Sequence, residues 1–480
     1  GGWPEQVLTT GKYLNVIREC GRAVACPFAT ELDYDLVQSR HGELVSAAHG
    51  WASARLLDLV RREQRLPQRL ASMKHYFFLD KGDFFVHFLD LAEAELGLDV
   101  ARISPTRLDT LLQLALNSSS VAEDPFRDNV TCEFSEYNLV HHMECIHGAS
   151  GGGGGGGMDR SSAAGSSTGA LRFAGNRLKG IEAFMFNYQV TWPLSIVVSK
   201  RALTMYQLLF RHLFFSKHVE RRLLNAWLGH QETKELDLRS AMAPTYSLRH
   251  RMLHFIQNFV YYMMFEVIEP RWHNLQEKIS KVKNVDEILR HHDDFLLTCL
   301  KECLLTSQDL LKILTKLTTT CLLFADAARR FAASHAVDAR GLLRDRALDE
   351  LERNDRGAKQ TKQTEMVNQI RKEKVEVQSG AVRRGLGAEA YRATLRRFAD
   401  QFDALLADLL RRLHHEDGPP ASSAGGGAAG TELGGGGGGA QYSSHLAALC
   451  DRLDYNGFFT ANLYDHHHHQ GEARGGGAAA

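Results

Sequence analysis

The sequence lacks the features that mark several large classes of protein. Its 57 Lys and Arg residues are balanced by 57 Asp and Glu residues, so it has none of the basic excess of a general nucleic-acid binder. No apolar run approaches the ~18 residues that a membrane-spanning helix needs. The longest such run, 259–265, is far too short. At 480 residues the chain is too long for one compact core, so we expect two or more domains.

Paired cysteines are also missing. The eight cysteines are scattered and none forms a CxxC pair. This usage predicts free, mostly buried thiols in a reducing compartment. The residues are Cys20, Cys26, Cys132, Cys145, Cys299, Cys303, Cys321 and Cys450.

Several sequence signatures of enzymes are absent as well. There is no Walker A loop, no HExxH, and no GxGxxG between a strand and a helix. The glycine runs 151–157 and 434–439 lack the Lys and Ser/Thr that cradle a phosphate. We therefore expect no catalytic residues, no cofactor and no enzymatic activity.

Apolar residues alternate between Phe184 and Val198. They fall on every second position and are rich in aromatic and β-branched types, which predicts a strand with one buried face. Pro193 cannot donate a ladder hydrogen bond, so it marks an edge or a break between two short strands. We expect a small β element near residues 184–198.

Most of the remaining sequence is typical of helices. Ser199 is placed to cap a helix whose buried stripe comprises Leu203, Tyr206, Phe210, Leu213 and Phe214. The segment 248–265 is apolar on nearly every side, which predicts burial between neighbours, and its helix should end at Pro270. The predicted fold is mainly α, with helices packed in bundles along an elongated body.

Two further helix starts carry capping signals. Gly82 predicts a turn, and Asp83 predicts a cap for the helix that begins with Phe84. Asn284 and Glu287 have the spacing of a capping box, in which each side chain satisfies a backbone N–H near the other.

Low-complexity segments interrupt the helices. The Gly/Ser/Ala tract 148–169 and the glycine-rich tract 418–440 have the composition of flexible linkers and are predicted to be disordered. Residues 332–385 are highly charged with little apolar periodicity, which fits either an extended exposed helix or disorder.

Histidines are clustered at three places in the sequence, and each cluster is either a metal site or a set of packed or solvated side chains. His141, His142, Cys145 and His147 run into a glycine tract that cannot hold rigid ligands, so packed or solvated side chains are favoured over a metal site. The run 291–294 (His-His-Asp-Asp) cannot converge on one ion if it is helical, and it is interpreted as a polar face. The run 466–469 lies in a tail. We expect no metal, while a histidine-rich metal protein using His141, His142 and Cys145 stays open.

Ordered blocks of the sequence resemble the gamma-tubulin complex component family. They include WPLSIVVSKRALTMYQLLFRHLFFSKHVER at 192–221, LRHRMLHFIQNFVYYMMFEVIEPRWH at 248–273, VDEILRHHDDFLLTCLKECLLT at 285–306 and LDYNGFF at 453–459. The resemblance implies a C-terminal gamma-tubulin-binding domain over 71–465, preceded at 1–70 by the end of an N-terminal domain and followed by a tail at 466–480. Because the chain opens with Gly-Gly-Trp, we expect a fragment of a longer protein.

By the same resemblance, the chain is expected to bind gamma-tubulin and to stand beside a component 3-like subunit in microtubule nucleation. The expected location is the cytoplasm and cytoskeleton, at microtubule-organising centres and spindle poles. Because interface hot spots tend to be aromatic or Arg, the candidate partner-binding residues are Phe184, Tyr188, Trp192, Arg211, Phe215, Lys217, His218, Arg221 and Arg222. The alternative is a generic helical scaffold that binds another cytoskeletal or trafficking partner.

Overall fold

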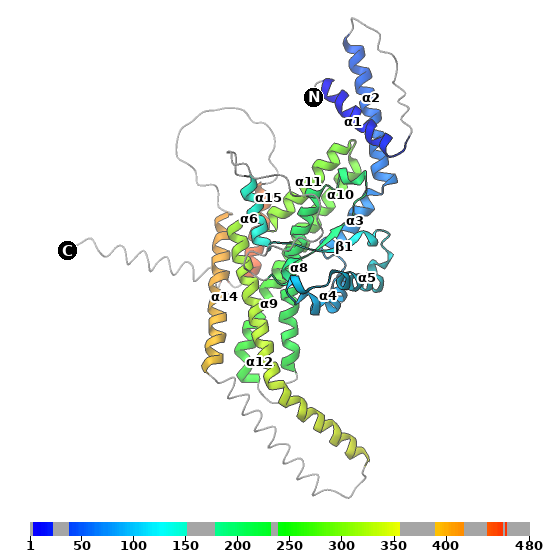
Figure 1. Cartoon of the computed structure of the whole chain (residues 1–480). Coiled ribbons are helices and arrows are strands. Elements are labelled where there is room, and N and C mark those ends of the chain that lie inside the picture. The colour runs from blue at the N-terminus through cyan, green and yellow to red at the C-terminus, as the bar shows by residue number, and fades with distance from the viewer. Residues whose placement is uncertain are drawn as a thin grey trace, which may run out of the picture. The chain divides into compact units, whose positions relative to one another are not determined.

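The computed structural model describes residues 3–22, 38–150, 178–231, 239–355, 389–416, 439–454 and 457. Within them the protein is mainly α-helical (Figure 1), as the sequence predicts. It divides into two compact units. Unit 1 comprises Gly1–Phe215 and Met263–Thr306, and unit 2 comprises Ser216–Tyr262 and Ser307–Ala480. No described helix has the length and apolar character needed to cross a membrane.

The helices of unit 1 are α1 (Trp3–Glu19), α2 (Gln38–Asp58), α3 (Leu66–Phe77), α4 (Gly82–Leu96), α5 (Pro105–Ser118), α6 (Leu139–Ser150), α7 (Gly180–Ala183), α10 (Glu269–Lys281) and α11 (Val285–Glu302). Short π or 3-10 turns are η1 (Leu59–Glu63), η2 (Val100–Arg102), η3 (Ser120–Glu123), η4 (Arg127–Asn129) and η5 (Leu194–Ile196). The helix α8 (Lys200–Gln231) and the π-helix η7 (Tyr262–Ile268) contribute residues to both units.

Unit 1 has an aromatic core. Phe77 and Phe78 of the α3 end lie against Tyr206 of α8, with ring centroids 5.4 Å apart in each pair. Phe186 lies 4.8 Å from Phe210, and Phe184 lies 5.1 Å from the ring of Phe214. All of these rings are buried, and large buried aromatic side chains contribute strongly to core stability. In the stripe predicted on α8, Tyr206, Phe210, Leu213 and Phe214 are therefore confirmed as core, whereas Leu203 is half-buried.

The predicted β element is confirmed but is shorter than the alternation implies. Strand β2 (Phe184–Tyr188) pairs antiparallel with β1 (Val130–Phe134), so that Phe184 faces Phe134 and Tyr188 faces Val130. Past Tyr188 the chain turns, and a cis bond before Pro193 leads into η5 rather than a second strand. Both faces of β2 are covered, because Met185 is buried along with its neighbours.

Pro270 does not end its helix as predicted. The backbone continues from α9 (Arg239–Tyr261) through the π-helix η7 directly into α10, with Pro270 in the first turn of α10. A π-turn shifts the hydrogen-bond register, and proline fits a first helical turn because its missing N–H has no intrahelical partner there. The capping by Ser199 is confirmed, since its Oγ accepts the N–H of Ala202 at 3.2 Å.

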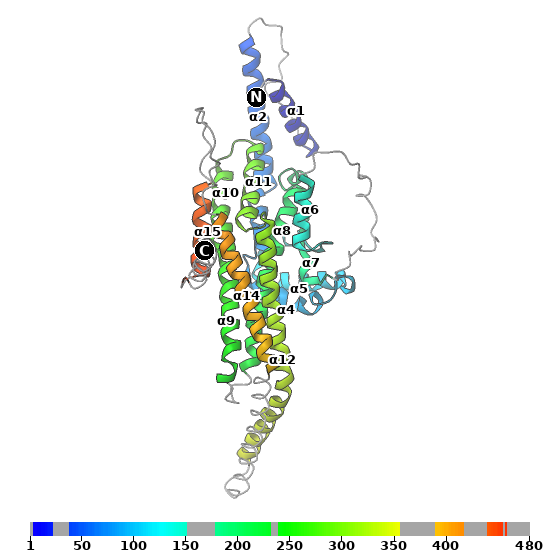
Figure 2. The ribbon, with the colours of Figure 1, turned by 90° about the vertical axis from the view of Figure 1, so that its left-hand side faces the viewer.

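Unit 2 is built from α9, α12 (Gln308–Asp355), α14 (Glu389–Glu416), α15 (Gly439–Leu453) and the second part of α8. Helices α9, α12 and α14 lie side by side in both views (Figures 1 and 2). Phe255 of α9 meets Phe402 of α14 edge to face at 5.9 Å. The charged segment that begins at residue 332 is helical as far as Asp355, and 356–388 lies outside the described residues.

The linker predictions fall largely outside the described residues. Residues 148–150 belong to α6 and 439–440 to α15, while the rest of both glycine-rich tracts and the run 466–469 are not described. The seven described cysteines are free thiols, as predicted. Four are buried (Cys299, Cys303, Cys321 and Cys450), while Cys145 is exposed.

Candidate partner-binding surface

The nine candidate partner-binding residues differ in accessibility. Four of them are buried within their own unit: Phe184, Tyr188, Arg211 and His218. A buried side chain can reach a partner only if the chain rearranges. Trp192, in contrast, is 49% exposed, and the remaining four (Phe215, Lys217, Arg221 and Arg222) are partly exposed. Partner contact by any of the nine stays a prediction.

Arg211 has a role inside unit 1 that explains its burial. Its guanidinium donates to Ser135 Oγ at 3.2 Å and to the carbonyl oxygens of Tyr137 at 2.7 Å and Glu182 at 3.0 Å. Burial lowers the pKa of this guanidinium to about 10, so it stays charged at neutral pH. Arg211 therefore ties α8 to the loop before α6 and to α7.

The candidates in unit 2 are also engaged within the chain. Arg222 forms an ion pair with Asp326 of α12. Lys217 Nζ lies 3.0 Å from Glu220 Oε2 on its own helix. Burial lowers the pKa of Arg221. A partner that uses Arg222 would have to compete with Asp326 for the guanidinium.

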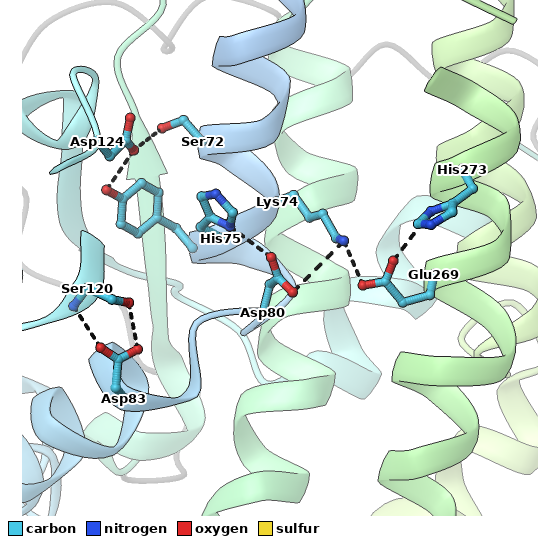
Figure 3. Close-up of polar contacts among 10 residues, drawn as sticks. Ser72, Lys74, His75, Asp80, Asp83, Ser120, Asp124, Glu269 and His273 are labelled. Carbon is cyan, nitrogen blue, oxygen red and sulfur yellow. Dashed lines mark hydrogen bonds and ion pairs between the residues drawn. The ribbon is translucent and has the colours of Figure 1, made fainter. Parts of the chain in front are cut away.

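A network of charged side chains that the sequence analysis did not identify joins α3 to α10 (Figure 3). Lys74 Nζ lies 2.6 Å from Glu269 Oε1 and 3.9 Å from Asp80 Oδ1. Asp80 Oδ2 lies 2.8 Å from His75 Nδ1, and this hydrogen bond is the main cause that lowers the pKa of Asp80. His273 Nδ1 lies 3.7 Å from Glu269 Oε2. Each carboxylate therefore lies between Lys74 and a histidine.

A small cavity lies beside this network. Its volume is about 90 Å³, and its walls are Lys74, Phe78, Asp80, Met264, Phe265, Ile268 and Glu269. Cofactor and drug sites usually measure ~300–1,000 Å³, so this space is too small for one. Phe265 is 55% exposed and Tyr261 is 46% exposed, which contradicts the predicted burial of this segment on every side. The π-helix η7 explains the difference at Phe265, because its wider turn changes the direction in which successive side chains point.

Asp83 satisfies a different helix end from the one predicted. Its carboxylate accepts the backbone N–H of Ser120 at 2.7 Å and the Ser120 hydroxyl at 2.9 Å, at the start of η3 (Figure 3). The bond from the Ser120 N–H is the main cause that lowers the pKa of Asp83. On α4 itself Asp83 lies in the first turn and Lys81 is the cap residue, with no side-chain cap bond.

The described side chains of the clusters at 141–145 and 291–294 make contacts within the chain. His142 Nδ1 faces the Arg211 guanidinium at 3.4 Å, while His141 Nε2 lies 3.7 Å from Cys145 Sγ. In the part of the chain that the structure describes, no three His, Cys, Asp or Glu side chains are grouped to hold a metal ion. His292 corrects the interpretation of 291–294 as a polar face, because it is fully buried against Tyr206.

Comparisons with known proteins decide the family. The family model described as "Gamma tubulin complex component C-terminal" matches residues 66–459. The chain is 38% identical over 466 residues to mouse gamma-tubulin complex component 2, covering 95% of this chain and 47% of that protein. It is 40% identical over 335 residues to Arabidopsis thaliana gamma-tubulin complex component 2, covering 69% of this chain and 47% of that protein.

This chain belongs to the gamma-tubulin complex component family. A member named as a spindle pole body component, alp4 of Schizosaccharomyces pombe, is 34% identical over 371 residues, covering 68% of this chain and 47% of that protein. The resemblance inferred from the sequence blocks is confirmed. The chain spans about half the length of these relatives.

The family's sequence blocks contain both exposed and buried side chains in this structure. The block 192–221 holds exposed Trp192 and buried Arg211, and the block 248–273 holds exposed Phe265 and buried Trp272. Residue type alone therefore does not distinguish the exposed side chains of these blocks from the buried ones. For the Lys74 network, the only local sign in the sequence is Asp80, six residues after Lys74. The second carboxylate that pairs with Lys74 belongs to Glu269, which is 195 residues away.

Proposed function

We propose that this chain is a gamma-tubulin-binding scaffold subunit of a gamma-tubulin complex and acts in microtubule nucleation. Membership of the gamma-tubulin complex component family carries this proposal. The chain then works beside a component 3-like subunit at microtubule-organising centres and spindle poles, in the cytoplasm and cytoskeleton. Residues 71–465 form its gamma-tubulin-binding domain, 1–70 the end of an N-terminal domain and 466–480 a tail.

The physical task of such a scaffold is to overcome the slow first step of assembly. The first lateral contacts between tubulins do not offset the entropy lost on association. A protein that holds gamma-tubulins side by side raises their effective concentration without making a chemical bond. Densely packed aromatic cores, such as Phe184 with Phe210 and Phe214, provide the rigidity that holding a partner in place requires.

Trp192 is the residue on which we propose to test partner binding. It is a large aromatic side chain that is 49% exposed, and exposed aromatic anchors are enriched among interface hot spots. The expected result is that the full chain co-elutes with purified gamma-tubulin on a sizing column. Trp192→Ala should weaken that complex roughly tenfold or more, which corresponds to about 1.4 kcal/mol.

A matched control separates partner contact from general loss of surface area. Leu297 of α11 is 45% exposed, so Leu297→Ala removes a similarly accessible apolar side chain of the same unit and should leave the complex intact. Equal weakening by both variants would reject Trp192 as a contact. A folded chain that forms no complex with gamma-tubulin would favour a generic helical scaffold with another partner.

A further inference from the structure

Only one serine or threonine in the whole sequence is followed by proline. The chain has 10 prolines, and the one that follows a hydroxyl residue is Pro105, which comes directly after Ser104 at the start of α5. Arg107 lies two residues further on, so the segment reads Ser-Pro-Thr-Arg. Proline next to the serine has no N–H and a fixed φ, and the arginine adds a positive charge one turn later. Such a hydroxyl suits a serine kinase whose substrate site accepts proline directly after the serine.

The Ser104 hydroxyl is accessible in the folded chain. Ser104, Pro105, Thr106 and Arg107 are all exposed. The backbone enters α5 in an extended conformation, with φ −86° and ψ 112° at Ser104, and the Ser104 side chain makes no capping hydrogen bond to the helix. Only the first turn of α5 has to open for a kinase to bind 103–107 as an extended strand, and helix ends open at low cost in free energy.

Arg107 pairs with a carboxylate of the neighbouring helix. Its Nη1 lies 2.8 Å from Oε1 of Glu95 in α4, whose side chain is 10% exposed, whereas the Arg107 side chain is 68% exposed. Ser104 and Arg107 are three residues apart in the first turn of α5, a spacing at which side chains meet. A phosphate on Ser104 carries about two negative charges and accepts a two-point hydrogen bond from arginine, so it competes with Glu95 for the guanidinium.

We propose that Ser104 is phosphorylated by a proline-directed serine kinase and that the phosphate then binds Arg107 in place of Glu95. In this step the Ser104 oxygen attacks the γ-phosphorus of ATP, and the bond from that phosphorus to the β–γ bridging oxygen breaks. ADP leaves, and the hydroxyl proton passes to the catalytic carboxylate of the kinase. Buried Glu95 then loses its cation, which weakens the contact between α4 and α5. The site goes beyond gamma-tubulin binding and does not depend on it.

The test incubates the full chain with a recombinant serine kinase of the cyclin-dependent class and Mg-ATP, and mass spectrometry locates the phosphate. We expect one phosphate, on Ser104. Ser104→Ala should abolish this phosphorylation, whereas Ser104→Thr keeps a hydroxyl and should retain it. Pro105→Ala also keeps the hydroxyl but should lower the rate roughly tenfold or more, because the kinase then loses the contact that selects its substrate.

Ser118, at the other end of α5, provides the matched control. It is exposed, but Ser119 follows it instead of proline, so Ser118→Ala should leave the incorporated phosphate unchanged. Circular dichroism shows whether each variant keeps its helices. Equal incorporation into the wild-type chain and the Ser104→Ala variant would overturn the proposal, and so would a folded wild-type chain that accepts no phosphate at Ser104.

Phosphorus NMR of the phosphorylated chain tests the exchange of partners by Arg107. A guanidinium beside the phosphate stabilises its doubly charged form, so the second pKa of the phosphate should lie below its ordinary value of about 6. After extended reaction with the kinase, the Arg107→Gln variant should show a higher phosphate pKa than the wild-type chain. Arg201→Gln, at an exposed arginine of the same unit, should leave that pKa unchanged. A phosphate pKa that ignores Arg107→Gln would show that Arg107 stays with Glu95 and would overturn this part of the proposal.

Discussion

Tyr206 and His292 are hydrogen-bonded to each other in the core of unit 1, with the hydroxyl oxygen 3.0 Å from Nε2. Neither side chain reaches solvent, since both are fully buried. Burial lowers the pKa of His292 from its ordinary 6.5 to about 4. His212 of α8 is also buried, and its pKa is likewise lowered to about 4. Both imidazoles are therefore neutral in the folded protein at neutral pH.

Acid should destabilise unit 1 through these two histidines. Between about pH 6.5 and pH 4 these two imidazoles bind protons in the unfolded chain but stay neutral in the folded protein. The stabilisation is complete above pH 6.5 and is lost as the pH falls, by up to about 3 kcal/mol for each histidine at pH 4. Denaturant unfolding at a series of pH values measures this slope. His292→Gln should flatten it, because the variant has no buried imidazole at this position.

Arg211→Met should destabilise unit 1 without creating a large cavity. The variant keeps the apolar length of the side chain but removes the donors to Ser135 and to the carbonyls of Tyr137 and Glu182. Ser135 Oγ still donates to the Tyr137 carbonyl in the variant, so the change chiefly removes the donor to the Glu182 carbonyl, and a loss of about 1–3 kcal/mol in unfolding free energy is expected. Arg201→Met on the exposed side of the same helix should change it by less than about 0.5 kcal/mol. Equal losses of unfolding free energy in the two variants would show that the hydrogen bonds of Arg211 do not stabilise unit 1.

Periodicity was enough to predict most of the buried face of α8. Tyr206, Phe210, Leu213 and Phe214 are core because a 3.6-residue repeat of apolar residues marks the side of a helix that packs on its neighbours. The local cap at Ser199 was also predictable, since its partner is three residues away. These features depend on neighbours in the sequence.

Contacts between distant segments explain the predictions that were wrong. Asn284 does not complete a capping box, because its Oδ1 accepts the Ser53 hydroxyl of α2 at 2.9 Å, while Glu287 accepts the N–H of Lys283 instead. His292 was predicted to lie on a polar face because its buried partner, Tyr206, is 86 residues away in the sequence. The burial of Arg211 likewise depends on α7 and the loop before α6, which its own helix does not indicate. The sequence of one helix cannot report which other elements pack on it.

Lys74→Met should weaken the junction of α3 with α10. The ammonium lies between Asp80 and Glu269 and 5.7 Å from the centre of the Trp272 ring, so its replacement removes the cation that both carboxylates share. A loss of about 1–3 kcal/mol in unfolding free energy is expected. The double variant Lys74→Met with Glu269→Gln removes one of those carboxylates and should recover part of the loss, which a double-mutant cycle measures. Strict additivity of the two changes would contradict the proposed coupling.

Gly180→Ala tests how closely α7 approaches the end of α4. The Gly180 N–H donates to the carbonyl of Leu98 at 2.9 Å, and an added Cβ would lie 2.3 Å from Ile103 Cδ1 and 3.0 Å from the carbonyl oxygen of Leu96. The Ile103 methyl can move, but the backbone oxygen cannot move without shifting α4, so a loss of about 1–3 kcal/mol is expected. Gly50→Ala is the matched control, because nothing lies within 4 Å of its added Cβ in α2. That change should stabilise the chain by about 0.5–1 kcal/mol through helix propensity. Denaturant midpoints that move in the same direction for both variants would show that the Leu96 backbone yields to the methyl group.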